Sequence, residues 1–281
     1  MTLQKFIYVT NYVVRYLDTG PPPSNDSNIL ILLHGIGSSS DVWIRVIPTL
    51  SKHYRLINPD IIGFGYSDKP ITEYTIDFFI DFFKGFLDNL HISRASILGW
   101  SILGSDIATE FAIRFSGNNI NNENIVEKLI LVSPSGQMRT SSTSSMLDSY
   151  VISAQAPTYC NAYTAFRYMV HDPSFMCEYT VIDFVNIMRL PNAKYAFLSA
   201  WESLKHAPKI KGRAYRIDCP TLRVRGINDK IIPIDYLDDY NEIPQIEIEV
   251  IDNCGHIPHI EKPITFSKIV LSFLGDSYHG N

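Results

Sequence analysis

The sequence lacks any apolar run long enough to cross a membrane. Its strongest run, Ile29 to Leu33, has the length of a strand, whereas a membrane-spanning helix needs about 20 apolar residues. Residues 1–6 lack the charged-then-apolar order of a secretory signal peptide. The four cysteines are scattered without a Cys-x-x-Cys pair, which in a chain this long is typical of free thiols in a reducing compartment. We therefore expect a cytoplasmic protein with no membrane span.

Positive charge is also scarce. The chain has 24 Lys and Arg against 29 Asp and Glu, a net charge of −5, and no run of basic residues. A general nucleic-acid binder needs a basic surface to neutralise phosphates, so we expect no nucleic-acid partner. The histidines show no His-Glu-x-x-His or other metal-ligand spacing. We expect neither a metal nor another cofactor.

The composition is otherwise that of a globular protein. Of 281 residues, 46% are apolar and 19% charged, which is enough to bury a sizeable core. Short apolar segments alternate with amphipathic helical ones, a pattern that predicts a parallel sheet covered on both faces. The expected strands are 6–16 (as one or two segments), 28–33, 54–58, 95–100, 127–132, 221–224 and 246–251; the expected helices are 42–50, 76–90, 102–115 and 263–274.

The strand rhythm stops after Ser133 and resumes after Arg213. A Ser/Thr-rich hinge over 140–145 leads into mainly helical sequence between these points. We predict a core domain of residues 1–134 and 214–281, with a helical cap of residues 135–213 inserted after the sixth strand. Such a cap would lie over the carboxyl ends of the strands, where parallel sheets bind ligands. Most of its Tyr, Phe, Met and Leu side chains are expected to form the cap's own core, and a minority to line a pocket.

The segment Gly99 to Gly104 contains Ser101 at the point where a strand turns directly into a helix. A serine on such a tight turn exposes its Oγ, and the glycines let the backbone turn without clashes. Taken alone, a serine between glycines is equally consistent with a simple turn. Serine is a poor nucleophile unless a base lies beside it and an acid orients that base.

A second glycine-rich loop, Gly35-Ile36-Gly37, follows the strand that ends at Leu33. Its Ile36 N–H and the Ile102 N–H are expected to converge on one point, as the two donors of an oxyanion hole. The alternative, a phosphate-binding loop, would need the pattern G-x-x-x-x-G-K-[ST], which is absent.

Two further loops supply a candidate base and acid. His256 follows the strand 246–251, with His259 as its rival close to the start of a helix, and Asp229 follows the strand 221–224. A lone loop histidine is more often structural, and a loop aspartate is common turn chemistry. The combination is more specific, because Ser, Asp and His after successive strands is the chain order of a known catalytic triad architecture.

Five motifs in this order resemble those of the α/β-hydrolase superfamily over essentially the whole chain. They are His34 to Gly37 with Trp43, Asn58 to Asp68, Gly99 to Ser101, Gly226 to Asp229, and Gly255 to Pro263. The resemblance implies an α/β-hydrolase fold with Ser101 as nucleophile, Asp229 as acid, His256 as base, and the backbone N–H groups of Ile36 and Ile102 as oxyanion donors. Serine at the elbow argues against the epoxide-hydrolase and dehalogenase branches, which attack with a carboxylate.

The chain departs from the family pattern at one position. Two residues after the nucleophile the family usually has glycine, and here Leu103 stands there, with Gly104 one place later. We expect Leu103 either to push the helix outward and misalign the Ile102 N–H, or to occupy a space of its own. In the first case Leu103→Gly should raise turnover; in the second it should only lower stability.

The function expected from these residues is that of a serine hydrolase that cleaves carboxylic esters through an acyl-enzyme, acting on a small apolar or aromatic ester-like substrate. One alternative is hydrolysis of a C–C bond in a ring-cleavage product of the 2-hydroxy-6-oxo-dienoate type. We rank it lower because such relatives usually have a more Gly/Pro-rich oxyanion loop than 35–38, and often Trp where this chain has Ile257. The other alternative is a ligand-binding or lyase member of the fold without hydrolytic activity.

Overall fold

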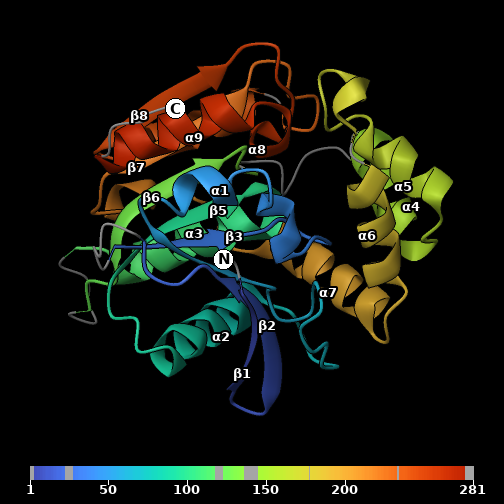
Figure 1. Cartoon of the computed structure of the whole chain (residues 1–281), viewed down its shortest axis with the longest axis horizontal. Helices are drawn as coiled ribbons and strands as arrows, with labels where there is room; N and C mark the ends of the chain where they lie inside the picture. The colour runs from blue at the N-terminus through green and yellow to red at the C-terminus, as the bar shows by residue number, and fades with distance from the viewer. Residues whose placement is uncertain are drawn as a thin grey trace.

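The computed structural model describes residues 3–22, 28–117, 123–135, 145–176, 178–232 and 234–275. Its centre is an eight-stranded sheet of order β1-β2-β4-β3-β5-β6-β7-β8 (Figure 1). The β1–β2 and β2–β4 pairs are antiparallel, and all the others are parallel. The strands are β1 (Leu3–Val9), β2 (Tyr12–Asp18), β3 (Ile29–Leu33), β4 (Arg55–Pro59), β5 (Ala95–Trp100), β6 (Val126–Val132), β7 (Thr221–Gly226) and β8 (Ile246–Ile251).

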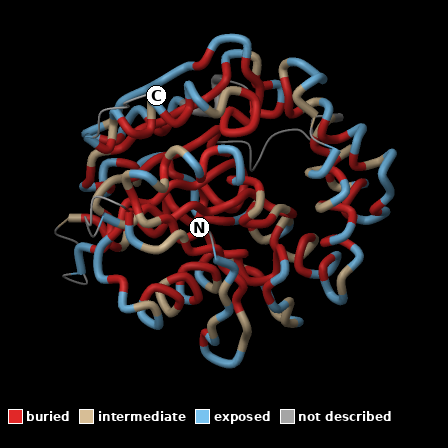
Figure 2. Tube along the Cα trace, in the orientation of Figure 1, coloured by how far each residue is buried: buried red, intermediate tan, exposed pale blue. Residues whose placement is uncertain are grey.

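Helices cover the two faces of this sheet. In Figure 1, α2 (Ile76–Asn89) lies below the central strands and α9 (Pro263–Leu274) above them. The helix α3 (Ser101–Phe115) continues directly from β5 and packs against α2. Every residue of β5 and of β7 is buried, as expected for parallel strands that are covered on both sides. Figure 2 shows this buried trace through the middle of the molecule.

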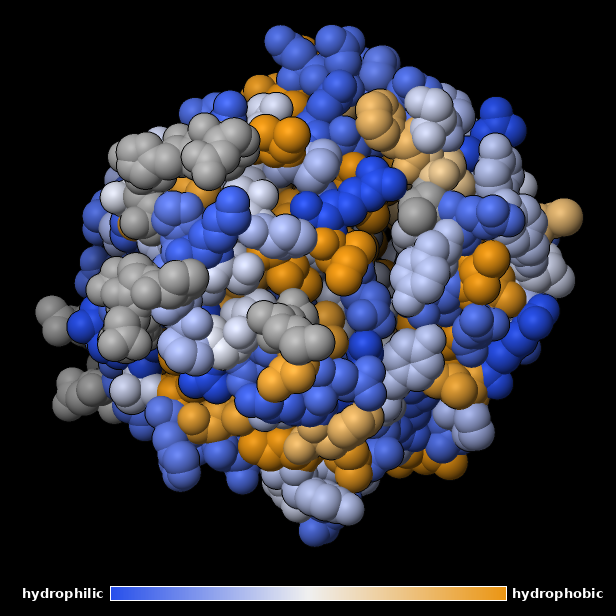
Figure 3. All heavy atoms as spheres, viewed as in Figure 1, coloured by the Kyte–Doolittle hydropathy of each residue, from blue (hydrophilic) through white to orange (hydrophobic). Residues whose placement is uncertain are grey.

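Between β6 and β7, the described residues form four α-helices. They are α4 (Ser145–Gln155), α5 (Tyr159–Phe166), α6 (Glu178–Met188) and α7 (Ala193–His206), and they gather at one side of the molecule in Figure 1. In the space-filling view of Figure 3, the surface is hollowed between this group and the sheet. The hinge expected over 140–145 falls almost entirely outside the described residues, so the boundaries of the cap stay a prediction.

Sequence reasoning was wrong about one helix. The segment 42–50 is not one helix but a 3₁₀ turn over Ser40–Trp43 followed by the short α1 (Ile47–Leu50). Pro48 lies in the first turn of α1, where its missing N–H costs no hydrogen bond. A continuous helix through 42–50 would instead place that proline in its interior, where it breaks the hydrogen-bond ladder.

Three cysteines in the described part of the chain, Cys160, Cys219 and Cys254, are free thiols, and Cys177 lies outside the described residues. No helix among the described residues is both long and apolar enough to span a membrane. Within the same ranges, no group of three or more His, Cys, Asp or Glu side chains is placed to hold a metal ion.

Candidate active site

The sheet brings Ser101, Asp229 and His256 into one hydrogen-bonded chain. Ser101 follows β5, Asp229 follows β7 and His256 follows β8, so all three lie at carboxyl ends of parallel strands. Ser101 Oγ lies 2.7 Å from His256 Nε2, and His256 Nδ1 lies 2.9 Å from Asp229 Oδ2. Both the histidine and the aspartate side chains are 1% exposed. This is the geometry that nucleophile, base and orienting acid require.

The two oxygens of Asp229 have separate partners. Oδ2 faces His256, while Oδ1 accepts hydrogen bonds from the backbone N–H groups of Ile231 and Ile232 at 2.8 and 3.0 Å. Burial on its own would raise the pKa of Asp229, but the facing His256 and the two backbone donors lower it overall. The carboxylate is therefore ionised, accepts from His256 Nδ1, and leaves Nε2 facing the serine.

The rival histidine, His259, takes no part in the hydrogen bonds that join Ser101, His256 and Asp229. Its ring is fully buried, with ring centroids 4.3 Å from Trp43 and 4.8 Å from Trp100. Neither ring nitrogen has a hydrogen-bond partner among the described residues. Burial, together with the nearby His256, holds the pKa of His259 well below its usual range, so the ring is neutral.

The backbone of the His256 loop is fixed from three directions. The His256 N–H donates to the carbonyl of Met169 at 2.7 Å, and Trp100 Nε1 donates to the His256 carbonyl at 3.1 Å. The Glu261 carboxylate accepts from the N–H groups of Gly255 and His171 at 2.7 and 2.8 Å. Met169 and His171 come from the segment between β6 and β7. Sequence reasoning missed this support, because a main-chain carbonyl leaves no signature in the side chains.

The turn at Ser101 depends on two glycines. Ser101 has a φ of 58°, a strained backbone that active sites commonly maintain. A Cβ atom on Gly99 would lie 2.2 Å from the Gly104 carbonyl oxygen, and one on Gly104 would lie 2.5 Å from the Leu33 oxygen. Gly104 thus makes the close approach between helix and strand that the family's earlier glycine was expected to make. The side chain of Leu103 is fully buried.

The two expected oxyanion donors are not both free. The Ile36 N–H donates to the carbonyl oxygen of Ile102 at 2.8 Å. Ile102 has a ψ of 141° and Leu103 a φ of 78°, so the peptide between them is turned out of the helical direction. The expectation of two open donors therefore fails in this conformation for Ile36, because the turned carbonyl already occupies its N–H.

His34, the first residue of the oxyanion loop, has a structural position. Its Nδ1 lies 2.8 Å from the Gly35 carbonyl, and its Nε2 accepts from the Ile61 N–H at 3.0 Å. These partners assign the proton to Nδ1. Burial lowers the pKa of His34, so the neutral ring ties the end of β3 to the loop after β4.

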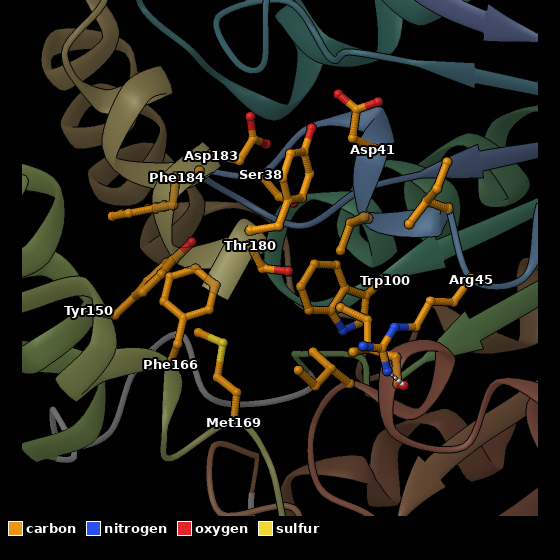
Figure 4. Close-up of a pocket in the computed structure, with 16 residues that line it drawn as sticks. Ser38, Asp41, Arg45, Trp100, Tyr150, Phe166, Met169, Thr180, Asp183 and Phe184 are labelled. Atoms are coloured by element: carbon orange, nitrogen blue, oxygen red, sulfur yellow. Dashed lines mark hydrogen bonds between the residues drawn. The ribbon is translucent and has the colours of Figure 1, made fainter. Parts of the chain in front are cut away.

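A pocket lies beside the hydrogen-bonded residues Ser101, His256 and Asp229, between the helices that follow β6 and the sheet. Trp100 and Ile257, the sequence neighbours of Ser101 and His256, line it. Figure 4 shows the opposite wall of Tyr150, Phe166, Met169 and Phe184 facing Trp100. The Tyr150 hydroxyl donates to the Ile36 carbonyl at 2.5 Å, and burial raises the pKa of Tyr150, so it stays a donor. The oxyanion loop and the pocket wall are thus joined.

Asp183 on α6 and Asp41 after β3 also line the pocket. Asp183 accepts from Ser39 Oγ at 3.0 Å and from the Tyr66 hydroxyl at 2.7 Å. Burial raises the pKa of Asp183 overall, although these two donors lower it. Asp183 therefore joins α6 to two loops of the core.

Comparison with known proteins agrees with this geometry. The sequence model of the alpha/beta hydrolase fold family matches residues 28–263. The chain belongs to this family.

Relatives of the chain include hydrolases that are named for dienoate and semialdehyde compounds. It is 26% identical over 263 residues to 2-hydroxy-6-oxo-2,4-heptadienoate hydrolase of Pseudomonas putida, covering 88% of this chain and 89% of the relative. It is 27% identical over 266 residues to 2-hydroxymuconate semialdehyde hydrolase of a Pseudomonas species, covering 88% and 87%. A meta-cleavage product hydrolase of Pseudomonas fluorescens has the same fold, with a TM-score of 0.81 at 24% identity over 96% of this chain and 97% of that one.

Proposed function

We propose that this α/β hydrolase is a serine hydrolase in which Ser101 is the nucleophile, His256 the general base and Asp229 the group that orients the imidazole. The observation that carries the proposal is the continuous hydrogen-bonded chain from Ser101 Oγ through both nitrogens of His256 to the Asp229 carboxylate. The fixed tautomer leaves His256 Nε2 free to accept the serine proton.

The chemistry follows from this arrangement. Ser101 Oγ forms a bond to the substrate carbonyl carbon, its proton passes to His256 Nε2, and the carbonyl electron pair moves onto oxygen. The backbone N–H groups of Ile36 and Ile102 are the proposed donors to that oxyanion, and the Ile36 N–H can serve only after it leaves the Ile102 carbonyl. His256 then gives the proton to the leaving group, and water cleaves the acyl-enzyme by the same steps. No cofactor takes part in this scheme.

For the substrate, we place first a ring-cleavage product of the 2-hydroxy-6-oxo-dienoate type, cleaved at a C–C bond. The support is the likeness to relatives with such names over nearly nine tenths of the chain and a pocket wall of aromatic side chains that suits a planar conjugated molecule. In this hydrolysis the hydroxyl of water ends on the carbonyl carbon and its proton on the carbon that leaves. The conjugated dienoate is what delocalises the electron pair of that carbon.

Hydrolysis of a carboxylic ester is the second candidate, although sequence reasoning placed it first. Two positions of this chain favour it, Ile257 after His256 and Ser38 after Gly37, because both differ from what the family resemblance implies for C–C hydrolases. In either case we propose that residues 135–213 act as a cap, with the core in 1–134 and 214–281. Five aromatic or methionine side chains of the pocket come from the cap: Tyr150, Phe166, Met169, Tyr179 and Phe184.

A direct comparison of two substrates tests the proposal. Wild-type protein is assayed on 2-hydroxy-6-oxo-6-phenylhexa-2,4-dienoate and on 4-nitrophenyl butyrate, with Ser101→Ala and His259→Phe beside it. We expect a higher kcat/KM on the dienoate, and loss of nearly all turnover in Ser101→Ala, with a residual ~10³–10⁴-fold acceleration over water. His259→Phe should keep turnover because His259 touches neither Ser101 nor Asp229.

Each contrary result has a definite meaning. Preference for the butyrate ester would move the function to ester hydrolysis. Wild-type turnover in pure Ser101→Ala protein would remove the nucleophile assignment. Failure of a fluorophosphonate probe to label Ser101 in the wild-type protein would refute the hydrolase proposal as a whole.

A further inference from the structure

The peptide between Ile102 and Leu103 points in an unusual direction. In a regular helix, ψ and φ lie near roughly −42° and −63°, but Ile102 has a ψ of 141°, and Leu103 has φ and ψ of 78° and −64°. These angles turn the peptide plane by about half a rotation. They also place Leu103 at the centre of a γ-turn with positive φ, which is rare and strained for a residue with a side chain.

Both polar groups of this peptide have buried partners. The Ile102 carbonyl accepts from the Ile36 N–H at 2.8 Å, and the Leu103 N–H donates to Asp106 Oδ2 at 3.1 Å. The other carboxylate oxygen, Oδ1, accepts from Ser135 Oγ at 2.7 Å. Asp106 and Ser135 are each 1% exposed. An acid that reaches back three residues to a backbone N–H is the arrangement that caps a helix start, and here it holds the turned peptide.

We infer that Leu103 and Asp106 are positioning residues that set the direction of this peptide, and thereby decide whether the Ile36 N–H is open to a substrate oxyanion. The inference rests on the proposed hydrolase function. In the observed direction, the Ile102 carbonyl occupies the N–H that the oxyanion needs, and its partial negative charge repels the charge that develops there. The peptide must rotate before or during the attack by Ser101.

Opposing effects balance the two directions. The positive φ of Leu103 favours rotation back to the helical direction, in which the Ile102 carbonyl would accept from the N–H four residues later. The hydrogen bonds from Ile36 and to Asp106 favour the turned direction. A change that relieves the strain at residue 103 should therefore favour the turned direction, in which the Ile102 carbonyl blocks the Ile36 N–H. This reverses the expectation from sequence that Leu103→Gly speeds the enzyme.

The matched pair Leu103→Gly and Leu103→Ala separates backbone direction from side-chain packing. Both variants lose the same buried side chain to within one methyl group, but only glycine adopts positive φ without strain. We expect Leu103→Ala to have a kcat on 4-nitrophenyl butyrate about fivefold above that of Leu103→Gly, with KM unchanged. Phosphonylation of Ser101 by a fluorophosphonate should differ by the same factor, because its phosphoryl oxygen needs the same donors.

Asp106→Asn and Asp106→Ala form a second pair. Asparagine can still accept from the Leu103 N–H, whereas alanine removes the acceptor and so destabilises the turned direction. The alanine variant should therefore have the higher kcat of the two, with a smaller difference in KM. Unfolding in urea provides a check on folding, and Leu103→Gly should be the more stable of the Leu103 pair.

Several results would overturn the inference. A kcat for Leu103→Gly equal to or above that of Leu103→Ala would do so while leaving the proposed function intact. Equal stability of these two variants would show that residue 103 does not have a strained positive φ, and the inference depends on that strain. Absence of both hydrolysis and Ser101 labelling in wild-type protein and every variant would instead refute the proposed function, and the inference with it.

Discussion

His259 should make the fold sensitive to acid, and His259→Phe should remove that sensitivity. The ring of His259 is fully buried among Trp43, Trp100 and Phe266. Neither of its nitrogens has a hydrogen-bond partner among the described residues. A proton on this ring would place an uncompensated charge in an apolar site, which is why the pKa of His259 lies well below 6.5 in the folded protein.

The sign of the effect follows from proton uptake in the two states. Below pH 6.5 the unfolded chain binds a proton at residue 259 and the folded protein does not. Acid therefore favours unfolding: the contribution is present above pH 6.5 and is lost as the pH falls. One proton gives a slope of up to ~1.4 kcal/mol per pH unit. Between pH 6.5 and 4.5 this slope limits the loss to at most roughly 2.5 kcal/mol.

The assay is the free energy of unfolding in urea at several pH values between 4.5 and 8 for wild type and His259→Phe. Groups such as Asp229 titrate in both proteins and cancel in the difference. We expect the variant to gain stability relative to wild type progressively below pH 6.5. At pH 8 its stability should be near that of wild type, because phenylalanine fits the aromatic surroundings and leaves no polar group unpaired.

His34→Phe is the matched contrast, since His34 is equally buried but hydrogen-bonded at both nitrogens. Its replacement leaves the Ile61 N–H and Gly35 carbonyl without these partners and should cost ~1–3 kcal/mol already at pH 8. A difference between wild type and His259→Phe that does not change with pH would refute the reasoning, because it would mean that His259 takes up its proton within the fold.

Two further predictions concern the glycine and tyrosine contacts of the site. Gly104→Ala should cost ~1–3 kcal/mol of stability and lower kcat, since its Cβ would meet the Leu33 carbonyl at 2.5 Å. Gly85→Ala in α2 meets only a Val9 methyl at 3.2 Å and should stay within ~1 kcal/mol of wild type by urea unfolding; equal losses would contradict the argument. Tyr150→Phe removes the bond to the Ile36 carbonyl and should cost ~0.5–1.5 kcal/mol, lowering kcat more than it changes KM in steady-state assays. An unchanged kcat would show that this contact does not position the loop.

The sequence allowed the central strands and the order of the three site residues to be predicted for a simple physical reason. β5 is buried on both faces, so its residues are mostly apolar. At Gly99 and Gly104 another backbone approaches so closely that a Cβ atom would clash with it, so these positions need glycine. Such constraints restrict residue type at single positions and are therefore visible in one chain. The prediction of one helix over 42–50 was wrong because the apolar residues have helical spacing, while Pro48 permits a helix only from the residue before it onward.

The direction of the Ile102–Leu103 peptide could not be predicted in this way. It depends on a backbone N–H in the loop after β3 and on a carboxylate one turn into α3. Neither partner is recognisable before the two segments are placed side by side. The sequence marks Leu103 only as a departure from the family pattern, because a side chain does not indicate in which direction its backbone turns.

The segment between β6 and β7 contributes to the site through main-chain contacts as well as through side chains that line the pocket. The Met169 carbonyl holds the His256 N–H, the His171 N–H binds Glu261, and the Tyr150 hydroxyl binds the Ile36 carbonyl. In each contact at least one partner is a backbone group, so substitution of most pocket side chains leaves the support of the base intact. The pocket wall can thus change its shape to suit a substrate while His256 stays in place. Movement of the whole segment would instead disturb the base and the oxyanion loop together, because the same helices and loops hold both.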